Sequence, residues 1–93
     1  MDKKIFKESK DRIRRYVAEH RLRDAFALAR SLSEGMMNWE LSREIERGEE
    51  SYRYMLDYAS RGAEDPGRSA MVADLGEKVL GVVDRLEREN LKG

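Results

Sequence analysis

The sequence contains no cysteine, which excludes disulfide bonds, thiol nucleophiles and zinc sites built on thiolates. One proline and seven glycines among 93 residues are too few turn-forming residues for a β-sandwich of many short strands. No stretch approaches the roughly 20 apolar residues of a membrane-spanning helix, and the first residues, MDKKIFKESK, lack the apolar run of a signal peptide. We therefore expect a cytoplasmic protein that does not enter a membrane.

A net charge is also missing, because 19 Lys and Arg residues balance 19 Asp and Glu residues. The charges are nevertheless unevenly placed: residues 1–30 hold ten basic and five acidic residues, and residues 31–65 hold four and nine. The simplest arrangement pairs these two halves, with the basic stretch 12–23 against the acidic third helix. The overall balance argues against a nucleic-acid-binding domain, which usually carries a basic surplus.

Apolar residues recur at helical spacing along the whole chain. We predict an all-α fold in one domain, residues 1–93, with helices over about 3–19, 22–34, 38–61 and 66–90. The short connections make consecutive helices antiparallel neighbours. The predicted architecture is therefore a helical-repeat-like bundle of two antiparallel hairpins, a short pair followed by a long pair.

Each predicted helix has an apolar stripe that marks the candidate core. The stripes contain Phe6, Ile13, Tyr16 and Val17; Leu22, Ala25, Phe26 and Ala29; Leu41, Ile45, Gly48, Tyr52, Met55 and Ala59; and Met71, Leu75, Val79, Val82 and Leu86. We also expect Leu56 in the core. At Gly48 either another backbone approaches the third helix or the helix kinks, whereas Gly76 and Gly81 lie off the fourth stripe.

Two helix starts carry recognisable capping residues. Asn38 is a predicted N-cap of the third helix, because its side-chain oxygen can accept a hydrogen bond from an unpaired backbone N–H. Asp65 and Pro66 have the residue types favoured at the N-cap and first position of the fourth helix.

The polar residues do not form a recognisable catalytic or metal-binding motif. The acidic group of the third helix is interleaved with arginines, which favours a solvated face of ion pairs, and no Glu-x-x-His motif of a di-metal bundle occurs. That group contains Glu40, Glu44, Glu46, Glu49 and Glu50. His20 is the single histidine and lies where the first stripe ends. We expect no enzymatic activity, no cofactor and no metal.

The aromatic residues of the third helix are the best candidates for contact with a partner. Tyr54 lies about 140° around the helix from the apolar stripe, at 100° per residue, and Tyr58 follows it by one turn. Large side chains on more than one face of a helix indicate a second layer or a contact surface. The candidate partner-contact residues are Tyr54, Tyr58 and Trp39.

Two segments resemble tetratricopeptide-repeat proteins. The stretch from Tyr16 to Ala29 is similar to a helical hairpin of that family, with an aromatic residue in the first helix nine residues before the small Ala25 in the second. The stretch 51–66 resembles the amino-terminal helical region of large bacterial proteins of this kind. The resemblance implies a protein-interaction scaffold that is part of a longer chain, with no catalytic residues.

These observations favour a non-enzymatic helical module that binds protein. Its partner would be a downstream domain of its own chain, its own copy or another protein, with no role at a membrane. One alternative is a small helical protein that associates with itself. Another, which the charge balance disfavours, is a nucleic-acid-binding domain that uses residues 12–23.

Overall fold

The computed structural model describes residues 2–60 and 68–92, with only the backbone described at 58–60, 68, 69 and 92. It contains four helices: α1 (Lys3–Ala18), α2 (Leu22–Gly35), α3 (Trp39–Ser60) and α4 (Arg68–Lys92). No strand occurs within these residues, so the predicted all-α class is confirmed. The predicted cap and first turn at Asp65 and Pro66 lie outside the described residues.

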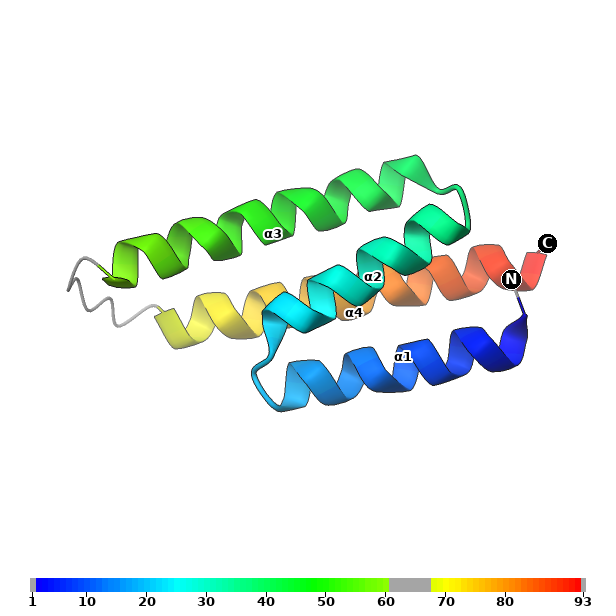
Figure 1. Cartoon of the computed structure of the whole chain (residues 1–93), viewed down its shortest axis with the longest axis horizontal. Helices are drawn as coiled ribbons and strands as arrows, with labels where there is room; N and C mark the ends of the chain where they lie inside the picture. The colour runs from blue at the N-terminus through cyan, green and yellow to red at the C-terminus, as the bar shows by residue number, and fades with distance from the viewer. Residues whose placement is uncertain (1, 61–67, 93) are drawn as a thin grey trace.

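The helices run alternately up and down and pack into a flat bundle with extents of 46 × 23 × 15 Å. In Figure 1, α3 and α1 form the upper and lower edges, and α2 and α4 cross the middle. Helix α4 contacts the other three helices, whereas the described residues of α1 and α3 do not touch. The acidic third helix therefore does not pair with the arginines of α1, and that part of the expectation was wrong.

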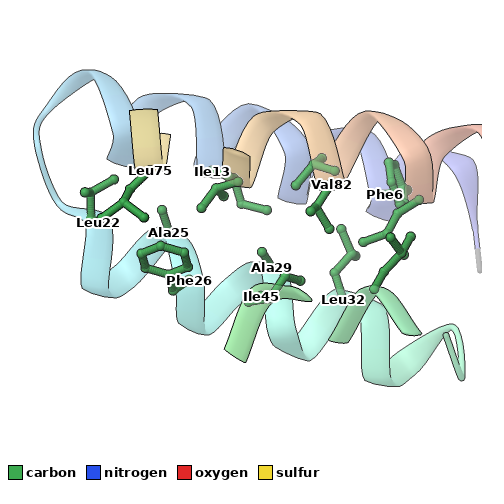
Figure 2. Packing of buried hydrophobic residues seen from close by; sticks show 14 residues of the cluster. Phe6, Ile13, Leu22, Ala25, Phe26, Ala29, Leu32, Ile45, Leu75 and Val82 are labelled. Carbon is green, nitrogen blue, oxygen red and sulfur yellow. The ribbon is translucent and has the colours of Figure 1, made fainter. Parts of the chain in front are cut away.

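One hydrophobic cluster joins all four helices (Figure 2). It is formed by Phe6, Ile13, Leu22, Ala25, Phe26, Ala29, Leu32, Leu41, Ile45, Leu75, Val79, Val82, Val83 and Leu86. Tyr16, Val17 and Tyr52 pack against it while remaining half-buried. Met71 is 42% exposed, and Leu56 is only half-buried, so these two predicted core positions were wrong.

Two glycines allow close approach between helices. A Cβ atom at Gly48 would lie 2.9 Å from Cε1 of Phe26, so a side-chain ring, rather than another backbone, occupies the space. Helix α3 continues through Gly48 without a break. Gly76 is buried, with Cγ1 of Val17 at 2.9 Å from its added Cβ, and thus belongs to the interface with α1 rather than lying apart from it.

Side-chain caps begin two of the helices. The Asn38 Oδ1 atom accepts a hydrogen bond of 3.1 Å from the backbone N–H of Leu41, which confirms the predicted cap of α3. The Asp2 carboxylate accepts a bond of 2.8 Å from the N–H of Lys4 at the start of α1. Between α1 and α2 the chain turns at His20, whose φ of 60° is left-handed.

Candidate functional site

Helices α3 and α4 extend past the start of α2. The Phe26 ring lies 6.1 Å from the Tyr52 ring, and a Cβ added to Gly76 would lie 3.9 Å from the Leu22 side chain. Because α2 begins at Leu22, the parts of α3 beyond Tyr52 and of α4 before Leu75 extend past the start of α2 (Figure 1), although Val72 still packs against the four-helix cluster. We call residues 53–60 and 68–74 the hairpin tip.

The described part of the hairpin tip has a closed inner side and exposed apolar groups. Met55 is 7% exposed, whereas Tyr54 is 77% exposed and Met71 is 42% exposed. The pairing of Glu44 with Arg85 at 2.9 Å sets the antiparallel register of α3 and α4. By that register Met71 lies about level with position 58, one helical turn beyond Tyr54. Exposed side chains of both helices therefore lie at similar height on the tip.

The three aromatic candidates do not form one surface. Tyr54 is exposed, as its angle around α3 predicted, and Trp39 is 60% exposed. Trp39 begins α3, and the 15 residues from Trp39 to Tyr54 correspond to about 22 Å along a helix. The Tyr58 side chain lies outside the described part of the structure. Trp39 thus belongs to the opposite end of α3 from Tyr54.

The acidic residues of α3 form ion pairs within their helix and across to its neighbours. Glu49 lies 2.7 Å from Arg53 in the next turn and 3.4 Å from Arg30 of α2. Glu44 receives two hydrogen bonds from Arg85 of α4, at 2.9 and 3.1 Å. Across residues 2–60 and 68–92, no group of three or more His, Cys, Asp or Glu residues is placed to hold a metal ion.

Two arginines of the basic stretch 12–23 already contact residues near the turn between α1 and α2. The guanidinium carbon of Arg21 lies 4.8 Å from the centre of the Tyr16 ring, and that of Arg12 lies 5.9 Å from it. Arg21 also donates a hydrogen bond of 2.8 Å to Asp24, which raises the pKa of Arg21. His20 is exposed beside this cluster. Two arginines of the stretch considered for nucleic-acid binding therefore lie against a tyrosine.

Helix α1 is joined to α4 by Lys10. Its Nζ atom lies 2.9 Å from Oε2 of Glu87 and 3.3 Å from Oδ1 of Asp84. The hydrogen bond to Glu87 raises the pKa of Lys10, although burial opposes the change. The basic α1 thus pairs with α4, and the printed ion pair between residues 1–30 and 31–65 is that of Arg30 with Glu49.

A groove of about 320 Å³ lies between α1 and α4 and was not predicted from the sequence. Four cations line it at helical spacing along α1, namely Lys3, Lys7, Lys10 and Arg14. Their spacing of four, three and four residues places them on one side of a helix, and that periodicity was the available signal. The stretch considered instead, 12–23, shares only Arg14 with this row.

Comparisons with known proteins supply no relative from which a function could be transferred. No family model matches the chain, and neither the curated proteins nor the solved structures contain a match. None of the helices, over the residues that the structure describes, is both long and apolar enough to cross a membrane. We therefore infer the function from the surfaces of the molecule itself.

Proposed function

We propose that the protein is a non-enzymatic interaction module that binds another protein through the hairpin tip. The observation that supports this most is the 77% exposure of Tyr54 on a segment that projects beyond the rest of the bundle. Its neighbour Met55 is 7% exposed, so this turn of α3 is packed on one side and open on the other. A rigid helix would therefore present the Tyr54 ring to a partner.

Tyrosine suits this role because it offers a large contact area and has few rotatable bonds to immobilise. Its hydroxyl stays hydrated when the surface is free and can form a hydrogen bond when it is covered. Met71, 42% exposed at a similar height, adds an adaptable apolar side chain. Aromatic anchors of this kind contribute much of the affinity at protein interfaces.

The proposal also includes the longer chain to which this domain would belong and its place in the cell. The similarity of residues 16–29 and 51–66 to tetratricopeptide-repeat proteins supports a scaffold role within a longer helical-repeat chain. The charged composition favours a cytoplasmic location. The complete reading frame beyond Gly93 would test the scaffold proposal directly, since further helical repeats are expected there.

A photo-crosslinking amino acid at position 54 tests the interaction surface. We expect an adduct of defined mass in cells that express the variant, and we expect Met71→Asp in the same chain to reduce its yield. A crosslinker at position 47 is the matched control, because Arg47 is exposed on the same helix outside the tip. An adduct with a second copy identifies self-association, and one with another protein identifies a heterologous partner.

Two results would contradict the proposal. One is the absence of any adduct at position 54, and the other is an equal adduct at position 47. Sedimentation and thermal unfolding of Tyr54→Ala provide the accompanying check on folding. Because the Tyr54 ring is largely exposed, the variant should unfold at nearly the same temperature as the wild type while losing its association.

A further inference from the structure

The groove between α1 and α4 lies at the opposite end of the bundle from the hairpin tip. It is formed by the first three turns of α1 and the last turns of α4, which meet at that end in Figure 1. Its volume of about 320 Å³ is open to solvent and falls at the lower end of ligand-binding pockets, which span about 300–1,000 Å³. We call it the α1–α4 groove.

The cations along the α1–α4 groove differ in whether they have a partner. Lys10 is held by Glu87 and Asp84 of α4. Within the described residues, Lys3, Lys7 and Arg14 make no ion pair. Unpaired cations on both sides of Lys10 are therefore available to a ligand along about three turns of helix.

The α1–α4 groove has an apolar floor, and its α4 wall combines apolar Leu91 with polar Glu87 and Asn90. Phe6 is 2% exposed and lies at the floor, and Leu91 is 60% exposed on the α4 side. Two carboxylates, Asp11 and Glu87, also line the groove. A ligand that fits must combine apolar side chains for the floor with negative charge spaced along the α1 side.

We propose that the α1–α4 groove binds an acidic amphipathic helix of a partner protein. In this mode of recognition a helix places its apolar stripe in a groove, using residues about one turn apart. Acidic residues on the flank of that helix would pair with Lys3, Lys7 and Arg14, whose own spacing follows the turns of α1. Charge complementarity of this kind sets orientation and accelerates association.

Other occupants match the α1–α4 groove less well. A nucleic-acid backbone carries a negative charge at every nucleotide, so it could not avoid the carboxylates of Asp11 and Glu87 as a helix with uncharged residues opposite them can, and it would leave the apolar floor unused. A second copy would have to offer α3, the most acidic helix. The exposed acids of α3 alternate with exposed Arg43, Arg47 and Arg53, so that helix is not uniformly negative.

The test uses a fluorescein-labelled helical peptide with Leu at positions i, i+4 and i+7 and Glu on both flanks. Binding is followed by anisotropy at physiological salt. We expect Lys7→Glu/Arg14→Glu to weaken binding about tenfold or more, because it reverses two of the unpaired cations. The matched control, Lys4→Glu/Arg15→Glu, makes the same charge change at exposed positions of α1 outside the groove.

Three outcomes would overturn the proposal: no binding of the acidic peptide, an equal loss in both double variants, or tighter binding of anionic lipid vesicles or duplex DNA than of the peptide. A peptide with Lys in place of Glu should not bind. Tyr54→Ala should retain peptide binding, since it alters the hairpin tip alone. That result separates failure of this proposal from failure of the proposed tip interaction.

Discussion

The missing side chain of Gly48 lets the ring of Phe26 reach the backbone of α3. A Cβ atom there would stand 2.9 Å from one ring carbon and 3.3 Å from another. Phe26 is itself 1% exposed and surrounded by the core, so its ring has little room to move away. The glycine weakens the helix locally but permits the packing of α2 against α3.

We expect Gly48→Ala to destabilise the protein by up to about 2 kcal/mol. Overpacking of a filled core typically costs about 1–3 kcal/mol, which exceeds the gain of up to about 1 kcal/mol in helix propensity. Urea unfolding measures the change. Gly81→Ala is the control, because nothing lies within 4 Å of its added Cβ. It should stabilise the protein by about 0.5–1 kcal/mol, and a gain of stability at Gly48 would contradict the packing described.

Truncation at Ile45 and Leu56 should have unequal effects. Ile45 is 2% exposed within the four-helix cluster, so Ile45→Ala should cost about 2–5 kcal/mol through lost burial and an unfilled cavity. Leu56 is half-buried on the hairpin tip, where Leu56→Ala should cost clearly less, on the order of 1 kcal/mol. Thermal or urea unfolding of both variants checks the order, and equal losses would show that the tip is as well packed as the centre.

At the scale of a helix, the start of α3 depends on Asn38. Its Oδ1 atom accepts the hydrogen bond from the Leu41 N–H at 3.1 Å. Asn38→Ala should lower the free energy of unfolding by about 1 kcal/mol, since an N-cap side chain contributes about 0.5–2 kcal/mol. Asn38→Asp should restore most of it, because aspartate caps equally well. A lack of rescue by aspartate would indicate that Asn38 acts through another contact.

The contact between α1 and α4 should weaken at high pH. The folded pKa of Lys10 lies above its ordinary value of 10.5, so its contribution is fully present below that pH and is lost as pH rises through the folded pKa. The stability difference between wild type and Lys10→Met should thus be constant from neutral pH towards 10.5 and shrink above that value. Lys4→Met, at an exposed position of the same helix, is the matched control. Urea unfolding over a pH series provides the measurement.

Element types and approximate bounds could be predicted from the sequence because the apolar periodicity is local information. The Asn38 cap and the exposure of Tyr54 follow from the same local rules. The partners of α1 could not be predicted, since the choice between α3 and α4 depends on how the two hairpins close on each other. Helix α4 (Arg68–Lys92) has no excess of acidic residues, so its sequence did not indicate that Asp84 and Glu87 would pair with Lys10.

Because local patterns do not show how the helices pack, the candidate sites could be predicted only in part. Leu56 and Met71 fit the apolar pattern of a core, but α1 and α2 are too short to cover their part of the long hairpin, with 16 and 14 residues against 22 and 25. The α1–α4 groove could not be predicted without knowing which helix packs against α1. The pattern within one helix thus predicts which of its faces is apolar. Only the packing of the four helices determines which faces remain exposed to solvent.

At the scale of the whole molecule, charge is separated across the width of the bundle. Helix α1 carries seven basic and two acidic residues, and α3 carries three basic and six acidic. These helices form opposite edges (Figure 1), with α2 and α4 between them. A molecule of zero net charge therefore offers a positive edge and a negative edge to its surroundings.

The alternation of the four helices also governs how quickly the chain can find this arrangement. Each helix packs against the next one in the sequence, and α1 with α4 is the pair most distant along the chain. Helical domains dominated by such near-neighbour contacts refold in microseconds to milliseconds. Loop closure between α1 and α4 is the largest entropic step, so Lys10 and its partners should acquire their contacts after the rate-limiting barrier, with φ-values near zero.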